Sequence, residues 1–261
     1  MGAEALDRVQ LEVDLRRAVE RGEFEVHYQP KVELETGRIV AVEALVRWEH
    51  PERGLLTPGE FIELAEETGL VVPIGQRVLE QACRQVRKWQ DEHGCDLPLE
   101  ANVYLSARQF RQPNLVGEVA RSLEESGLGA DRLELELTES AVMGYGEPIV
   151  GTMRELRALG VRLAIDDFGT GYSSLTYLKR FPVSTLKIDK EFVGGLGQDL
   201  EDTAIVRGVL GLGHGLGMKV VAEGIETPEQ LAALRALGCE RGQGYHLCRP
   251  LPPQELQALL S

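Results

Sequence analysis

The chain has 261 residues, of which 43% are hydrophobic and 27% are charged, as is usual for a globular domain. No apolar run approaches the roughly 20 residues that a membrane-spanning helix needs. The N-terminus, Met-Gly-Ala-Glu-Ala-Leu-Asp, is acidic and does not have the pattern of a signal peptide. We therefore expect a cytoplasmic protein without a membrane segment. The net charge of −14 argues against a nucleic-acid polymer as a partner, because such binding needs a basic surface.

Short apolar segments alternate with segments of helical pattern along the chain. An extra helix at about 4–21 is predicted before this alternation begins. Strands are predicted at 25–30, 39–48, 99–105, 132–137, 161–166, 183–188, 218–222 and 243–247. Helices are predicted at 73–89, 115–126, 148–159, 203–216, 228–237 and 253–260, with prolines near several starts and glycines just past several ends.

This order of elements predicts an α/β fold. Strands that are separated by helices are expected to be parallel, since parallel neighbours need a crossover connection. Eight strands in 261 residues suit one modified TIM (β/α)8 barrel over 1–261, because that fold typically needs about 250 residues. No clear helix separates 25–30 from 39–48, so this pair is predicted to include one antiparallel strand.

Polar side chains lie at or near the ends of these predicted strands. The pair Asp166-Asp167 closes an apolar run and opens a glycine-rich loop. Two adjacent carboxylates repel each other unless a cation lies between them, although a solvated strand end beside a turn is the plainer interpretation. Similar positions are held by Glu43, Glu136, Lys187, Asp189, Glu223 and Gln243. In a barrel these groups would converge on one mouth, where barrel enzymes have their active sites.

Clustered carboxylates point to a metal-dependent reaction on a phosphorylated ligand. Carboxylate oxygens suit Mg²⁺, Mn²⁺ or Ca²⁺, which would also screen the acidic surface. Two such ions about 3.5–4 Å apart would stabilise both the attacking and the leaving oxygen of a phosphoester. Asp166 is the best candidate for a carboxylate that bridges them.

Two other patterns give weaker indications. The glycine-rich stretch 211–217 suggests a phosphate loop, but it lies within a helical pattern and does not have GxGxxG spacing. Lys187 at a strand end would suit a Schiff-base lysine. The carboxylates at the same mouth favour its charged form, which disfavours that role.

An ordered set of short motifs extends over nearly the whole chain. They are Tyr28-Gln29-Pro30, Glu43-Ala44-Leu45-Val46-Arg47-Trp48, Glu136-Leu137-Thr138-Glu139, Asp166-Asp167-Phe168-Gly169-Thr170-Gly171-Tyr172-Ser173-Ser174, Leu186-Lys187-Ile188-Asp189, Val221-Ala222-Glu223-Gly224-Ile225-Glu226 and Gln243-Gly244-Tyr245. In this order they resemble the EAL domain family of cyclic di-GMP phosphodiesterases. The resemblance implies a modified barrel with one antiparallel strand, and hydrolysis of cyclic di-GMP to linear pGpG with Mg²⁺ or Mn²⁺. It also implies that Ca²⁺ binds but inhibits, and that the protein is a homodimer.

The resemblance assigns roles residue by residue. Glu43, Glu136 and Asp166 would hold one metal ion, and Asp166, Asp167 and Glu223 would serve the second. The implied catalytic residues are Lys187, which would orient the attacking water, together with Gln243 and Glu223. The residues implied to face the substrate are Gln29, Leu45, Arg47 and Asp189. Glu139 would steady a loop that couples dimer contacts to metal binding, formed by Phe168, Gly169, Thr170, Gly171 and Tyr172.

One position departs from the family pattern. The family reads Val-Asn-Leu-Ser-Ala where this chain has Val103-Tyr104-Leu105-Ser106-Ala107, so Tyr104 stands in the place of an amide metal ligand. Asn102 lies on the same strand face, but about 6.5 Å away at ~3.3 Å per residue, which is too far without a register shift. We expect weakened metal binding, with Tyr104 filling space and water replacing the amide.

Three functions follow as hypotheses. The first is an active metal-dependent phosphodiesterase, and the second is a catalytically weakened receptor that binds cyclic di-GMP. Only Tyr104 favours the second over the first. The third, an unrelated metal-dependent barrel enzyme of enolase or aldolase type, is disfavoured by the full motif set.

Overall fold

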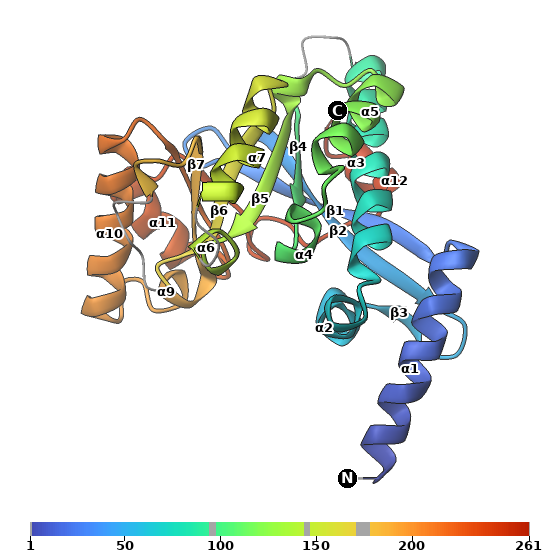
Figure 1. Cartoon of the computed structure of the whole chain (residues 1–261). Coiled ribbons are helices and arrows are strands. Elements are labelled where there is room, and N and C mark those ends of the chain that lie inside the picture. Colours follow the sequence, from blue (N-terminus) through green and yellow to red (C-terminus); the bar gives the residue numbers. More distant parts are fainter. Residues whose placement is uncertain (1, 94–97, 144–146, 171–177, 261) are drawn as a thin grey trace.

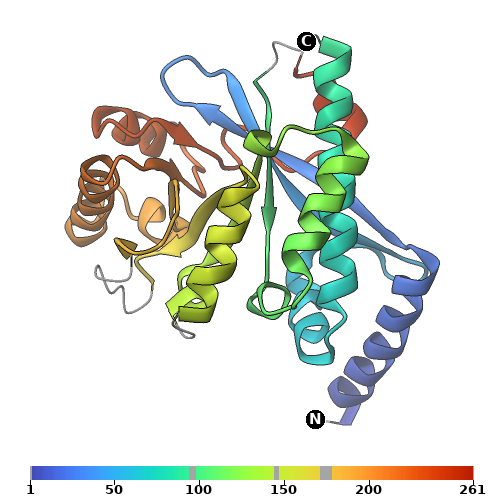
Figure 2. The ribbon, with the colours of Figure 1, turned by 45° about the horizontal axis from the view of Figure 1, so that its top comes forward.

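Eight strands close into a barrel in the computed structural model, which describes residues 2–93, 98–143, 147–170 and 178–260. The ring follows the order β1–β9–β8–β7–β6–β5–β4–β2, and β1 pairs with β2 to complete it. Its strands are β1 (Phe24–Glu33), β2 (Ile39–His50), β4 (Glu100–Tyr104), β5 (Leu133–Thr138), β6 (Arg162–Phe168), β7 (Thr185–Ile188), β8 (Lys219–Ala222) and β9 (Arg241–Gly242). A short β3 (Gly54–Leu56) pairs with the end of β2 outside the ring. The predicted modified barrel is confirmed (Figures 1 and 2).

The first strand runs against the others. β1 pairs antiparallel with both β2 and β9, whereas the remaining neighbours in the ring are parallel. The register places Gln29 opposite Glu43 and Lys31 opposite Ala41. Residues that come later in β1 therefore lie deeper in the barrel, which brings Lys31 below the mouth.

Helices cover the outside of the barrel (Figure 2). They are α2 (Pro58–Thr68), α3 (Val71–His93), α4 (Ala107–Phe110), α5 (Leu115–Ser126), α6 (Glu139–Met143), α7 (Glu147–Ala158), α9 (Lys190–Gly194), α10 (Leu200–Gly215), α11 (Pro228–Ala236) and α12 (Pro253–Gln257). A further helix, α1 (Gly2–Arg21), precedes β1 and extends away from the barrel in Figure 1. No described helix is both long and apolar enough to cross a membrane.

Local sequence explains several of the helix ends. Gly127 ends α5 in the left-handed conformation, with φ of 70°. Pro228 lies in the first turn of α11 behind the capping box of Thr227 and Gln230. The stretch 211–217 begins inside α10, which continues to Gly215, so this glycine-rich sequence is helical rather than a phosphate loop.

One predicted strand is wrong. The segment 243–247 is not a strand, because the last strand of the ring ends at Gly242. Beyond Gly242 the chain forms hydrogen bonds with the loop after β8: the backbone carbonyl of Gln243 accepts from Ile225, and His246 donates to the carbonyl of Ile225. A Cβ on Gly244 would lie 2.1 Å from the backbone nitrogen of Ile225, so this close approach requires glycine.

The two faces of the strands differ in polarity. Outward-facing side chains of β5 such as Leu133, Leu135 and Leu137 are fully buried in the core shared with the helices. Their neighbours Glu134 and Glu136 are buried on the inner face. At the opening where the parallel strands begin, Glu100 is paired with Arg162 at 3.0 Å, Arg241 at 3.1 Å and Lys219 at 3.7 Å. The interior is therefore charged along its axis, and the carboxylate cluster lies at the opposite end.

Candidate metal centre at the barrel mouth

The ammonium group of Lys187 lies at the centre of the barrel mouth. Its Nζ is 2.5 Å from Glu136, 2.6 Å from Glu223, 2.9 Å from Asp166 and 3.8 Å from Glu43. Burial lowers the pKa of Lys187, but the surrounding carboxylates outweigh this and hold that pKa well above its ordinary value. Lys187 is therefore the charged counter-ion of the cluster, and the charged form disfavours the Schiff-base role.

Glu136 is buried beneath this ammonium. Its Oε2 faces Lys187, while its Oε1 accepts hydrogen bonds from Lys31 and, at 2.9 Å, from Nδ2 of Asn102. Burial raises the pKa of Glu136, but Lys187 and Lys31 outweigh burial and bring it down to about 2. Glu136 is consequently ionised at neutral pH in spite of its complete burial.

Glu43 joins the cluster from β2. Its Oε2 accepts a hydrogen bond of 2.5 Å from Nε2 of Gln243, which also lies 3.5 Å from Oε1 of Gln29. Gln29 in turn donates to the backbone carbonyl of Cys248 at 3.0 Å. Three predicted site residues from distant parts of the chain are thus joined at one edge of the mouth.

Asp166, Asp167 and Glu223 bring carboxylate oxygens within 4.8 Å of one another. Asp167 has φ of 53°, a left-handed conformation that few residues other than glycine adopt. This conformation interrupts the strand alternation that would place consecutive side chains on opposite faces. Burial raises the pKa of Glu223 to about 8, aided by the charges of Asp166 and Glu43. Burial and the neighbouring charge of Asp166 raise the pKa of Asp167 to about 6.

The donor set fits divalent metal ions. It consists of carboxylate oxygens, which hard cations prefer, and their mutual repulsion is offset here by the ammonium of Lys187 and, at Glu136, by that of Lys31. Among the described residues, buried Oε1 of Gln243 has no hydrogen-bond partner, and Oε1 of Glu223 contacts Lys187 without hydrogen-bond geometry. Both oxygens can accept a cation or a water molecule. The residues implied to bind the second ion, Asp166, Asp167 and Glu223, have carboxylate oxygens close to one another. Glu43 and Glu136, which are implied to bind the first ion, both form an ion pair with Lys187.

Tyr104 lies beside this cluster at the end of β4. It pairs in register with Glu136, and β4 pairs regularly with both neighbours, so no bulge moves Asn102 toward the mouth. A hydrogen bond links the Tyr104 side chain to Thr138. Burial raises the pKa of Tyr104 to about 12, with further contributions from Glu66 and the two aspartates. The phenol is therefore neutral at physiological pH and a weak ligand for a hard cation.

Two cavities open on either side of the carboxylates. One of about 470 Å³ is lined by Glu43, Leu45, Tyr104 and residues of α2 and α3, such as Ile62 and Ile74. The other, of about 230 Å³, is lined by Gln29, Lys190, Glu223, Gly224, Glu226, Gln243, Gly244 and Tyr245. Together they give the mouth an apolar side and a polar side.

Two of the residues expected to contact substrate already have protein partners. Arg47 is 8% exposed, and its Nη1 donates to the backbone carbonyl of Val46 at 2.8 Å. Burial lowers the pKa of Arg47. Asp189 caps α9 by accepting from the backbone N–H of Glu191 at 2.7 Å. Asp189 also raises the pKa of Asp167, which connects it electrostatically to the carboxylate cluster.

The loop after β6 is tied to α6. Oε2 of Glu139 accepts a hydrogen bond of 3.1 Å from the backbone N–H of Gly169. Phe168 is buried, and the hydroxyl of Thr170 donates to the carbonyl of Asp167 at 2.8 Å. Gly171 and Tyr172, which complete the predicted coupling loop, lie outside the described residues.

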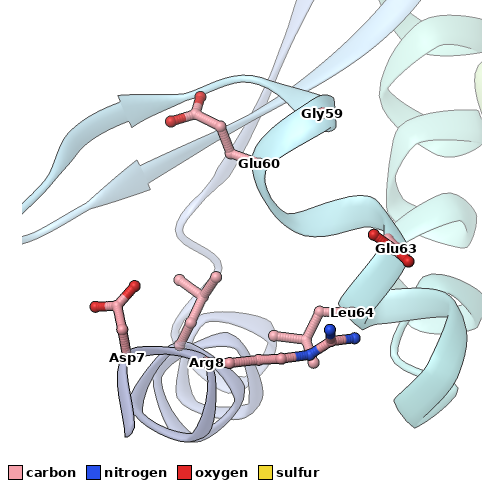
Figure 3. A pocket seen from close by; sticks show the side chains of 7 residues that line it. Asp7, Arg8, Gly59, Glu60, Glu63 and Leu64 are labelled. Atoms are coloured by element: carbon pink, nitrogen blue, oxygen red, sulfur yellow. The ribbon is translucent and has the colours of Figure 1, made fainter. Parts of the chain in front are cut away.

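A further cavity lies away from the mouth. It has about 480 Å³ and is lined by Asp7, Arg8, Leu11, Gly59, Glu60, Glu63 and Leu64, between α1 and α2 (Figure 3). It shares none of its lining residues with the carboxylate cluster at the mouth.

Sequence reasoning did not name the inner residues Lys31, Glu134 and Thr185, and it considered Asn102 only as a replacement metal ligand that lies too far from the place of Tyr104. Asn102 donates to Glu134 at 2.6 Å, and Thr185 donates to the other oxygen of Glu134 at 2.6 Å. Each of these residues lies two positions from a predicted site position: Lys31 from Gln29, Asn102 from Tyr104, Glu134 from Glu136 and Thr185 from Lys187. This spacing was the available signal, because residues two positions apart in a strand share a face.

The family model of the EAL domain matches residues 12–250, and the chain belongs to this family. It is 48% identical over 258 residues to the bifunctional diguanylate cyclase/cyclic di-GMP phosphodiesterase MucR of Pseudomonas aeruginosa, a match that covers 99% of this chain and 37% of MucR. It is 43% identical over 256 residues to the cyclic di-GMP phosphodiesterase NbdA of the same species, covering 98% of this chain and 32% of NbdA. The chain thus spans about a third of the length of these relatives.

Solved structures agree with this assignment. The PaMucR phosphodiesterase in its c-di-GMP complex has a TM-score of 0.91 and 49% identity, covering 95% of this chain and 99% of that one. The EAL enzyme Bd1971 in its cAMP and cyclic-di-GMP bound form has a TM-score of 0.93 and 35% identity, covering 99% of this chain and 70% of that one.

Proposed function

We propose that this chain is a metal-dependent phosphodiesterase that hydrolyses cyclic di-GMP to linear pGpG. The observation that carries the proposal is the carboxylate cluster gathered around Lys187 at the barrel mouth. The named activity of MucR and NbdA and the c-di-GMP complex of PaMucR support the choice of substrate. The proposal includes Mg²⁺ or Mn²⁺ as two bound ions, a homodimer and a cytoplasmic location.

The proposed ligands divide into two sets. Glu43, Glu136 and Asp166 would hold one ion, and Asp166, Asp167 and Glu223 the other. Bound divalent ions would supply positive charge to the reacting oxygens of the phosphodiester and make water a stronger nucleophile. With ions on the carboxylates, the ammonium of Lys187 would be released from its role as their counter-ion and would orient the attacking water. Gln243 would support that water, since its Oε1 has no other partner in the part of the chain that the structure describes.

The remaining residues would bind and place the dinucleotide. Gln29 lies opposite Glu43 in the pairing of β1 with β2, and Arg47 follows Glu43 by four residues along β2. The guanidinium group of Arg47 suits a phosphate. Leu45 lines the apolar cavity beside Glu43 and would contact a base. Glu139 would couple the loop after β6 to the metal site through its bond to Gly169. Asp189 would act through Asp167, whose pKa it raises.

The alternative is a receptor that binds cyclic di-GMP with little or no hydrolysis. The observation that favours it is Tyr104, a neutral phenol where the family has an amide ligand. Glu43, Glu136, Asp166, Asp167 and Glu223 are all retained, so we place the active enzyme first.

The deciding experiment measures turnover and binding on the same preparation. Cyclic di-GMP is incubated with Mg²⁺ or Mn²⁺ and pGpG is quantified by chromatography, while binding is titrated in Ca²⁺. Glu43→Gln should abolish turnover, and Glu124→Gln, on the exposed face of α5, is the matched control. Formation of pGpG by the parent chain supports the enzyme. Binding without pGpG supports the receptor, and the absence of both contradicts the two proposals together.

A further inference from the structure

The two oxygens of Glu136 have different surroundings. Oε2 points to the mouth, where it contacts Nζ of Lys187 at 2.5 Å. Oε1 points into the barrel, where it accepts from Nζ of Lys31 and from Nδ2 of Asn102. A divalent ion that took the place of Lys187 would therefore find Oε2 available and Oε1 already occupied.

The donors to Oε1 are held firmly. Lys31 and Asn102 are each only 1% exposed, so neither side chain can turn to water. The same Nδ2 of Asn102 donates to Glu134 at 2.6 Å, and the second oxygen of Glu134 accepts from Thr185. Rotating the Glu136 carboxylate would take the buried Lys31 ammonium from its hydrogen-bond partner and would remove one of the two hydrogen bonds of the Asn102 amide, which is costly.

We infer that Lys31 and Asn102 are positioning residues that reserve Oε1 of Glu136 and restrict this carboxylate to one oxygen toward a metal ion. The inference rests on the metal-binding part of the proposed function. Ca²⁺ accepts six to eight oxygens and often takes both oxygens of one carboxylate. Mg²⁺ and Mn²⁺ favour six ligands in octahedral geometry, which a single oxygen from each carboxylate suits. Lys31 and Asn102 thus bias the site against Ca²⁺.

Charge and hydrogen bonding can be separated by experiment. Removing the charge of Lys31 makes the site more negative, which by itself tightens every divalent ion to a similar extent. A gain in affinity that is similar for both ions leaves the ratio of Ca²⁺ affinity to Mn²⁺ affinity unchanged. The ratio changes only if Oε1 of Glu136 becomes free to bind the metal ion, because Ca²⁺ uses a second carboxylate oxygen more readily. Asn102 is neutral, so its replacement changes the hydrogen bond to Oε1 without changing the charge.

The experiment uses the full chain with Lys31→Met and Asn102→Ala. Mn²⁺ binding is followed by electron paramagnetic resonance, and Ca²⁺ binding by its competition with Mn²⁺. We expect the ratio of Ca²⁺ to Mn²⁺ affinity to rise about tenfold in each variant, as for other residues that orient metal ligands. Lys219→Met is the matched control, because it removes a lysine from the opposite opening of the same barrel and should leave the ratio unchanged.

The outcomes are distinct. Tighter binding of both ions in Lys31→Met, with an unchanged ratio in both variants, would mean that Lys31 acts only as a counter-ion and would overturn the inference. If Lys31→Met does not fold, as judged by circular dichroism, the ratio in Asn102→Ala decides alone. A parent chain that does not bind Mn²⁺ would refute the proposed metal site itself. A parent chain that binds Mn²⁺, with variants that keep its preference between the two ions, would refute only the inference about Lys31 and Asn102.

Discussion

Nζ of Lys187 lies 2.6 Å from Oε1 of Glu223, although the two residues are 36 positions apart in the sequence. They meet because β7 and β8 are neighbours in the barrel. The same nitrogen contacts Glu136 and Asp166. Before any metal binds, one ammonium therefore offsets several buried carboxylates. This arrangement couples the stability of the barrel mouth to the charge that occupies it.

Replacing Lys187 with Met should affect chemistry and stability differently. We expect turnover to fall at least about a hundredfold, with little change in cyclic di-GMP binding, because the ammonium would act on the attacking water. In the metal-free protein the variant should lose about 3–5 kcal/mol of unfolding free energy, since it leaves buried carboxylates uncompensated. Mn²⁺ should restore part of this loss. Steady-state kinetics and urea unfolding with and without Mn²⁺ test these effects, and Lys88→Met, which replaces an exposed lysine of α3, is the control. Normal turnover would show that Lys187 has another role.

Asp166→Asn tests the bridging carboxylate. Oδ2 of Asp166 accepts from Lys187 at 2.9 Å, and Oδ1 accepts from the backbone of Asp167 at 3.0 Å. A neutral amide in this position should weaken the binding of both ions, at least about tenfold for each. Isothermal titration with Mn²⁺ provides the measurement, and exposed Asp131→Asn is the control. Unchanged Mn²⁺ affinity would contradict the two-ion assignment.

Tyr104→Asn should restore an amide oxygen beside the carboxylates. We expect tighter Mn²⁺ binding and faster hydrolysis, by roughly one to three kcal/mol, which corresponds to about tenfold to a hundredfold. The gain should be largest at low metal concentration. Tyr104→Phe is the matched control, because it removes only the hydroxyl that bonds Thr138 and adds no ligand. If the parent chain is active and the Tyr104→Asn variant has the same Mn²⁺ affinity and the same rate, water already fills the ligand position.

Metal affinity should increase with pH between about 6 and about 8. The pKa of Asp167 is raised to about 6 and that of Glu223 to about 8, so protons compete with metal over this range. The stability of the metal-free protein should change in the opposite direction. A carboxyl group whose pKa is higher in the folded than in the unfolded protein contributes its full stability below the unfolded-state pKa. That contribution is lost as the pH rises through the folded-state pKa, so the unfolding free energy should fall over this range. Mn²⁺ titrations and urea unfolding at several pH values measure both trends. Glu223→Gln should flatten the upper part of each curve, and a parent curve without slope near pH 8 would contradict the role of Glu223.

Much of the barrel could be predicted because its signals are local. The helix 115–126 was predicted with the bounds that α5 has, since Gly127 marks its end. The antiparallel pair of β1 and β2 followed from the short link between them. The segment 243–247 has apolar residues and glycine, which resemble a strand, but its hydrogen bonds go to the loop after β8. A tertiary contact of this kind has no local sequence pattern.

The outer layer of the site was visible in the sequence, whereas its inner layer was not. Motif resemblance placed Glu43, Glu136 and Lys187 near one another, and the structure brings them together around one nitrogen. Lys31 is the single lysine of β1, and its partner Glu136 is 105 residues away. Only the reversed direction of β1 carries Lys31 below the mouth, and spacing alone does not give that depth.

The direction of β1 also determines which surface of the barrel is free for attachments. The turn that joins β1 to β2 contains exposed Glu35, Thr36, Gly37 and Arg38, and it lies where the parallel strands begin. A fluorophore or a fused reporter domain inserted at this turn would project from the base of the barrel, on the side opposite Lys187. Such a tag would allow the chain to be immobilised or followed optically with the mouth of the barrel left open.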